Sequence, residues 1–181
     1  MIIGLLFGSF DPIHVGHLYM ATAAINNDLV DKVLFIPAKQ NPWKTNKSVA
    51  FKHRCEMVAL AIKDIETFEL SKIELQTQSC YTATILELLM EEFPDDELVL
   101  ILGADTIVDV KNWYLGPWII DNFRMIAVTR EGFKGTYVFS IDKTLDISST
   151  EIRNLSKQNK QLYPLVPKEV EQYINTNNLY K

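Results

Sequence analysis

Residues 6–18 read LFGSFDPIHVGHL and hold two of the three histidines in the chain. The unbroken apolar run Ile2–Phe7 leads into this stretch, and apolar residues at helical spacing follow it over residues 16–27. An unbroken apolar run is typical of a strand buried on both faces of a parallel sheet. The stretch therefore predicts a first strand, a turn that contains glycine and a first helix, with both histidines at the turn.

Strand-like runs and helical patterns alternate along the rest of the chain, with no internal repeat or linker. This order predicts an α/β fold: one doubly wound, Rossmann-like, mostly parallel sheet with helices on both faces, in a single domain over residues 1–181. The later strands are expected at 33–36, 68–75, 98–102, 124–128, 137–141 and 145–147, and the later helices at 51–63, 82–93 (with Thr82 as N-cap), 150–157 and 168–175.

Three segments that follow predicted strands share one edge of this sheet: residues 8–17, 37–47 and 103–105. In doubly wound sheets the ligand binds outside the carboxyl ends of the strands. We therefore expect these three segments to form the functional site.

The composition is that of an ordinary folded protein. Hydrophobic residues make up 48% of the 181 residues and charged residues 23%, which excludes a disordered chain. The net charge of −5 argues against broad nucleic-acid binding but allows a local positive pocket. The two cysteines, Cys55 and Cys80, have no metal or redox spacing. With neither a signal peptide nor a membrane segment in the pattern, we expect a cytoplasmic protein with reduced thiols.

Other phosphate and metal motifs do not fit the opening stretch. A P-loop needs a lysine after its second glycine, whereas His17 follows Gly16. The dinucleotide fingerprint G-x-G-x-x-G is absent, and His53 and the two cysteines are too scattered for a zinc site. For two histidines around a glycine at a strand-to-helix turn, we favour a phosphate site over a structural role.

The residue types at the turn suit phosphate chemistry. Gly8 and Gly16 let backbone approach a ligand, and a helix that starts at Gly16 would present N–H groups to an anion. His14 and His17 are donors that can stabilise charge growing on a transferred phosphoryl group. Such a pocket needs no covalent nucleophile.

A second stretch, ISSTEIR at residues 147–153, indicates another helix N-terminus. Ser148 and Glu151 have the spacing of a capping box. Arg153 lies in the first turn of the predicted helix and could face the same anion. The prediction is that two helix starts, a hydroxyl cluster and an arginine converge on one polyphosphate.

The two stretches resemble two family signatures. Residues 8–17 resemble the GxFxPxHxGH signature of the HxGH nucleotidyltransferases, and residues 147–153 resemble the ISSTxIR signature of the same superfamily. Within it, the chain is similar to the bacterial nicotinate-nucleotide adenylyltransferases. The further matches, which extend the resemblance over essentially the whole chain, are His53-Arg54-x-Glu56-Met57, Tyr81-Thr82, Gly103-Ala104-Asp105, Trp113-Tyr114, Arg130-x-Gly132 and Tyr173-Ile174-x5-Leu179-Tyr180.

The resemblance implies transfer of the adenylyl group of ATP to nicotinic acid mononucleotide, with Mg²⁺ accompanying ATP and no metal site on the protein. It implies catalytic roles for His14, His17, Lys44 and Arg153. The implied ATP-binding residues are Gly8, Ser9, Phe10, His17, Gly103, Asp105, Arg130, Ile147, Ser148, Ser149 and Arg153, and the implied acceptor-binding residues are Tyr81, Thr82, Trp113 and Tyr114.

The chain departs from the family after its second predicted strand. The family usually has P-P-H-K there, whereas residues 41–44 read NPWK, so Trp43 replaces a histidine and Lys44 is kept. A lysine at this place could neutralise the departing pyrophosphate, and Trp43 could stack on a base or cover the pocket. We assign His53 and Arg54, on the next helix, to helix packing.

Several alternatives stay open. The acceptor could be nicotinamide mononucleotide or another phosphorylated molecule such as phosphopantetheine, although pantetheine-phosphate adenylyltransferases usually carry T-x-G-H where His14 stands. Cytidylyltransferases usually have an R-T-x-G-I-S-T-like motif, which is absent here. A sensor that binds NAD-like nucleotides without turnover is the alternative from another class, and a homo-oligomer is compatible with the sequence.

Overall fold

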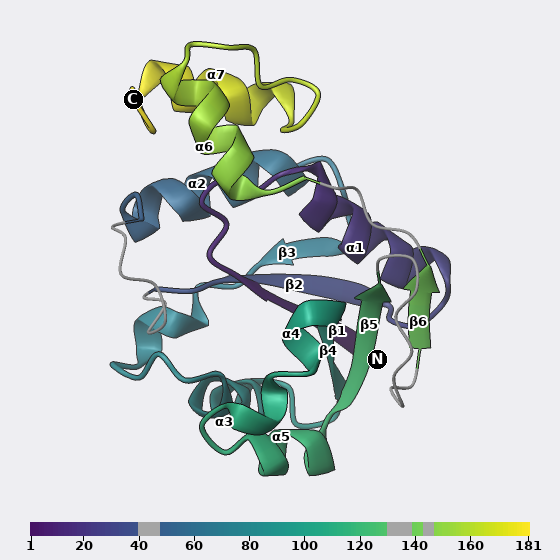
Figure 1. The fold of residues 1–181 in the computed structure, drawn as a ribbon. Coiled ribbons are helices and arrows are strands. Elements are labelled where there is room, and N and C mark those ends of the chain that lie inside the picture. The colour runs from purple at the N-terminus through teal and green to yellow at the C-terminus, as the bar shows by residue number, and fades with distance from the viewer. Residues whose placement is uncertain (40–47, 130–138, 143–146) are drawn as a thin grey trace.

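A parallel sheet of six strands forms the centre of the computed structural model, which describes residues 1–39, 48–129, 139–142 and 147–181 (Figure 1). The strand order is β3-β2-β1-β4-β5-β6, and all five neighbouring pairs are parallel. The order reverses between β1 and β4, which confirms the predicted doubly wound sheet. The strands are β1 (Ile2–Gly8), β2 (Lys32–Pro37), β3 (Phe68–Leu70), β4 (Glu97–Gly103), β5 (Arg124–Thr129) and β6 (Phe139–Asp142).

Helices cover both faces of the sheet, as predicted (Figure 1). One face carries α1 (Val15–Asn26), α2 (Phe51–Ile62), α6 (Ser149–Lys157) and α7 (Lys168–Thr176), and the other carries α3 (Thr82–Glu92) and α5 (Gly116–Asn122). The side chains of successive strand residues point to opposite faces of the sheet. In β2, Phe35 packs in the core under α1, α2, α6 and α7, called the first core, whereas Leu34 and Ile36 pack in the core under α3 and α5, called the second core. None of the described helices is long and apolar enough to cross a bilayer.

The differences from prediction lie in the short elements. Residues 68–75, predicted as one strand, are β3 followed by the 3₁₀ helix η1 (Ile73–Gln76). The Ser71 hydroxyl accepts the N–H of Ile73 at 3.3 Å, a local bond that competes with continuation of the strand. The sequence predicts no element over 104–122, which holds α4 (Ala104–Ile107), η2 (Val110–Asn112) and α5, because such short helices have little periodicity.

The last part of the predicted sheet is described only in places. The strand expected at 137–141 corresponds to β6. Residues 145 and 146 of the strand expected at 145–147 lie outside the described residues, and Ile147 is not in a strand.

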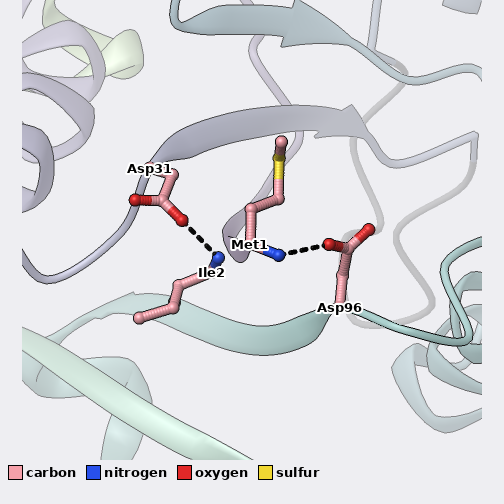
Figure 2. Close-up of polar contacts among 4 residues, drawn as sticks. All are labelled: Met1, Ile2, Asp31 and Asp96. Carbon is pink, nitrogen blue, oxygen red and sulfur yellow. Dashed lines mark hydrogen bonds and ion pairs between the residues drawn. The ribbon is translucent and has the colours of Figure 1, made fainter.

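Two aspartates form polar contacts with the backbone at the start of β1 (Figure 2). The N–H of Ile2 donates to Asp31 Oδ2 at 2.6 Å, and the amine of Met1 contacts Asp96 Oδ1 at 2.6 Å. Asp31 precedes β2 and Asp96 precedes β4, the two strands that flank β1. These contacts tie the amino ends of the central strands together. Gly8 lies at the other end of β1, where a doubly wound sheet binds its ligand.

Candidate active site

The turn after β1 brings the two histidines of the opening stretch into contact. His14 is the N-cap of α1, which begins at Val15, one residue before the predicted start. The backbone N–H of His14 donates to Nδ1 of His17 at 3.2 Å, and the two rings stack with centroids 3.8 Å apart. Because Nδ1 of His17 accepts this bond, a neutral His17 ring carries its proton on Nε2.

Part of the expected anion site at the start of α1 is used within the protein. The N–H of Val15 donates to the carbonyl of Leu165 at 3.0 Å, and the N–H of His17 donates to the carbonyl of His14 at 2.9 Å. The start of α1 therefore has fewer N–H groups available to an anion than the sequence suggests.

His14 is a buried histidine. His14 is 7% exposed, and its Nδ1 has no hydrogen-bond partner among the described residues. Burial lowers the pKa of His14 from 6.5 to about 4, so the ring is neutral at pH 7. A buried polar atom without a partner is uncommon and often marks a functional position. The backbone N–H of His17 is directed at the His14 side chain in a capping box, so the ring has one further nitrogen with which a neutral imidazole could donate to a phosphate oxygen.

The second motif packs directly against the same turn. Ser148 is the N-cap of α6, and its Oγ accepts a first-turn backbone N–H at 3.2 Å, as the capping box predicts. The Ser149 hydroxyl donates to the carbonyl of Pro12 at 2.9 Å. The Arg153 guanidinium donates to the carbonyl of Asp11 at 2.7 Å. Two signatures from opposite ends of the chain therefore meet through hydrogen bonds.

Asp11 connects this turn to two further segments. Its Oδ1 accepts the hydroxyl of Tyr180 at 2.8 Å and the N–H of Val49 at 3.3 Å. Burial, with the nearby Asp11 carboxylate, raises the pKa of Tyr180, so the phenol stays a donor. Sequence reasoning gave neither Asp11 nor Tyr180 a role. Both lie in matched motifs, but no spacing shows that residues 169 positions apart come into contact.

Gly8 and Phe10 shape the wall beside His17. A Cβ added at Gly8 would lie 2.9 Å from atoms of the Phe10 ring, so this ring fills the space that we expected a ligand to use. Phe10 is 1% exposed, and its ring meets the His17 ring edge-on with centroids 5.0 Å apart. The Phe10 side chain therefore supports His17 from the core.

Gly8→Ala is expected to lower the free energy of unfolding by about 1–3 kcal/mol, because the added methyl group overpacks a fixed ring. It should also lower kcat, since Phe10 moves against His17. Denaturant unfolding and steady-state kinetics measure the two effects. Gly103→Ala is the stability control, because the nearest atom to a Cβ there is 4.0 Å away. Equal stability of the two variants would contradict the packing argument.

The predicted acceptor residues form a second group around the start of α3. The rings of Tyr81 and Tyr114 lie 4.7 Å apart between centroids, and both residues are exposed. Trp113 is half-buried and packs against the second core. Thr82 is not the N-cap as predicted: Tyr81 takes that position, and Thr82 is the first helical residue. Tyr81 is placed there because the Ser79 hydroxyl accepts its N–H at 3.2 Å.

The other predicted site residues occupy the same edge or lie outside the described residues. Gly103 ends β4 and is the N-cap of α4, which contains Asp105. Ile147 packs against the first core, and the carbonyl of Ser9 accepts a bond from Arg54 at 2.7 Å. The two predicted residues outside the described ranges are Lys44 and Arg130.

Comparison with known proteins identifies the family. A family model described as Cytidylyltransferase-like matches residues 5–155. A protein from Bacillus subtilis (strain 168), named nicotinate-nucleotide adenylyltransferase, is 34% identical over 185 residues, 99% of this chain and 98% of that protein. This chain belongs to the nicotinate-nucleotide adenylyltransferase family. A Thermus thermophilus protein, named probable nicotinate-nucleotide adenylyltransferase, is 37% identical over 187 residues, 100% of both chains.

A solved structure supports the fold of this nicotinate-nucleotide adenylyltransferase family member. The Plasmodium falciparum nicotinic acid mononucleotide adenylyltransferase complexed with NaAD has a TM-score of 0.84 and 23% identity, over 98% of this chain and 96% of that one. The match spans the doubly wound sheet and the C-terminal helices alike. The resemblance seen in the sequence is therefore confirmed at the level of family and fold.

Proposed function

We propose that this chain transfers the adenylyl group of ATP to nicotinic acid mononucleotide and releases pyrophosphate. In this step a phosphate oxygen of the acceptor bonds to the α-phosphorus of ATP, and the bond from that phosphorus to the bridging oxygen of pyrophosphate breaks. The product is deamido-NAD. The observation that carries the proposal is the contact between α6 and the turn over residues 9–14, here called the histidine turn. The chain also matches, over nearly its full length, a relative named nicotinate-nucleotide adenylyltransferase.

In this proposal the histidine turn provides positioning and charge stabilisation. His17, with its proton on Nε2, donates to the α-phosphate as charge grows there, and neutral His14 binds a neighbouring phosphate oxygen. Arg153 and Ser149 hold the turn through its carbonyls, and in this proposal they would lie beside the bound nucleotide. Lys44 would neutralise the departing pyrophosphate, as the sequence predicts.

Magnesium enters the proposed reaction as part of the substrate. The described residues bring together no group of three or more His, Cys, Asp or Glu side chains that could hold a metal ion. Mg²⁺ usually keeps most of its waters and binds through substrate phosphates. We therefore assign it to the phosphates of ATP, in the cytoplasm where ATP is abundant.

The start of α3 favours an acidic acceptor. Tyr81 is the N-cap of this helix and makes no side-chain capping bond to it, and the same residue forms the aromatic pair with Tyr114. A helix N-terminus attracts a carboxylate more strongly than a neutral amide. The nicotinate ring would lie against Tyr81 and Tyr114 with its carboxylate towards Thr82.

A substrate panel tests the function. The purified chain is incubated with ATP, Mg²⁺ and one acceptor, either nicotinic acid mononucleotide, nicotinamide mononucleotide or phosphopantetheine, and pyrophosphate and the dinucleotide are measured. We expect kcat/KM for nicotinic acid mononucleotide to exceed that for its amide by at least about tenfold. Preference for another acceptor would overturn the acceptor assignment. Binding without pyrophosphate release would identify a sensor.

Tyr81→Ala is expected to raise the KM for nicotinic acid mononucleotide by about tenfold, because it removes one ring of the aromatic pair. The KM for ATP should stay within about twofold, which makes ATP the internal control of the same experiment. Initial rates with each substrate varied in turn give both constants. A rise in the KM for ATP alone would move the pair to the nucleotide side of the site.

A further inference from the structure

Arg54 is a buried arginine whose guanidinium donates to three backbone carbonyls of the described residues. It lies on α2 and is 3% exposed. Its Nε donates to the carbonyl of Val49 at 3.1 Å, Nη1 to that of Ser9 at 2.7 Å and Nη2 to that of Lys39 at 3.2 Å. The planar guanidinium therefore fixes three peptide groups at once.

These three peptide groups belong to the segments that surround the proposed site. Ser9 follows β1 and opens the turn that leads to His14. Lys39 and Val49 lie on either side of residues 40–47, which follow β2 and contain Lys44. Arg54 thus sets the backbone of the histidine turn relative to both flanks of the lysine-bearing segment.

Two buried carboxylates complete the arrangement from the other side. The N–H of Lys39 donates to the Glu74 carboxylate, and the N–H of Val49 donates to Asp11. Lys39 and Val49 are therefore each held through both a carbonyl and an N–H. Glu74 is 4% exposed and Asp11 8% exposed, so little water competes for these bonds.

Helix packing alone does not account for an arginine at this position. Burial lowers the pKa of Arg54 and raises that of Glu74, which reflects the cost of taking both charges out of water. An apolar side chain would pack α2 without that cost. The bonds that an apolar residue could not make are those to Ser9, Lys39 and Val49.

We propose that Arg54 is a positioning residue for adenylyl transfer. It holds the histidine turn, the end of β2 and the residues before α2 in one geometry, so that His17 keeps its orientation towards the triphosphate. This inference rests on the proposed function, because it assigns His17 to that reaction. Misplacing reacting groups by about 1 Å is enough to cost up to about a hundredfold in rate.

The first test compares two arginine-to-lysine variants. Arg54→Lys keeps the charge but loses the planar fork, and we expect kcat to fall by about 10- to 100-fold with a smaller change in the KM for ATP. Arg124→Lys is the matched control, since Arg124 also donates to a backbone carbonyl, that of Leu29 at 3.0 Å, at the start of β5. We expect this control to retain kcat within about twofold. Equal losses in both variants would overturn the proposal.

A double-mutant cycle with His17→Ala separates positioning from a general loss of structure. If Arg54 acts through the histidine turn, Arg54→Lys should cost less than about threefold in the His17→Ala background. The same loss in both backgrounds would overturn the proposal. If a thermal denaturation measurement shows that Arg54→Lys is not folded, Arg54→Gln replaces it in the same cycle, with the same expected outcomes.

Amide hydrogen exchange provides a readout that needs no activity. In Arg54→Lys we expect faster exchange of the N–H groups of Lys39 and Val49, while Arg124→Lys leaves them unchanged. Unchanged exchange in Arg54→Lys would overturn the positioning role. A wild-type chain that releases no pyrophosphate would refute the proposed function instead, and faster exchange in Arg54→Lys would then still show that Arg54 positions these peptide groups.

Discussion

Replacing His17 by alanine is expected to lower kcat by at least about a hundredfold while the chain stays folded. The His17 ring is held on three sides: Nδ1 accepts the N–H of His14, the His14 ring stacks on it, and the Phe10 ring meets it edge-on. Such contacts leave one orientation for the proton on Nε2. A donor held in a fixed orientation is the condition for strong transition-state stabilisation in the proposed reaction.

The measurement is pyrophosphate release at saturating ATP and nicotinic acid mononucleotide, with circular dichroism to confirm the fold. His17→Gln keeps a side-chain N–H donor and should recover part of the lost rate. His53→Ala is the matched control, because His53 bonds to the Tyr173 hydroxyl between α2 and α7 and has no proposed role in catalysis. Normal turnover in His17→Ala would contradict the role that we give to the histidine turn.

The strands could be predicted from the sequence where the hydrophobic pattern was strong and unambiguous. The runs that became β1, β2, β4 and β5 are apolar without interruption, because these strands are covered on both faces. Residues 104–122 escaped prediction for the opposite reason. Their short helices are specified by close packing, as at Gly116, where a Cβ would lie 2.1 Å from the carbonyl oxygen of Val110.

The candidate site could be predicted where it is made of motifs and not where it is made of long-range hydrogen bonds. The stretches that hold His14 with His17 and Ser149 with Arg153 are recognisable from their spacing, and the second packs against the turn of the first. Their predicted convergence on one polyphosphate stays a prediction. The bond from Tyr180 to Asp11 and the three bonds of Arg54 join residues with no common pattern. Sequence reasoning assigned Arg54 to helix packing, because a helical position reveals burial but not the carbonyls that a guanidinium will reach.

His14 is expected to make the stability of the chain depend on pH between about 4 and 6.5. Its pKa is lowered by burial from 6.5 to about 4 in the folded chain, so the unfolded chain binds the proton more readily in this window. The contribution of neutral His14 is complete above pH 6.5 and is lost as the pH falls towards 4. The full loss corresponds to about 3 kcal/mol in the free energy of unfolding.

The variant His14→Gln isolates this effect because glutamine does not titrate. Urea unfolding of both proteins at pH 7.5 and pH 4.5 gives the difference in stability, in which the carboxylates common to both chains largely cancel. We expect the wild type to lose about 2–3 kcal/mol more than His14→Gln between the two pH values. An equal loss would mean that His14 keeps an ordinary pKa and is charged at mildly acidic pH. In the proposed reaction a neutral His14 would bind phosphate as a hydrogen-bond donor, and the positive charge opposite the triphosphate would come from Mg²⁺, Arg153 and Lys44.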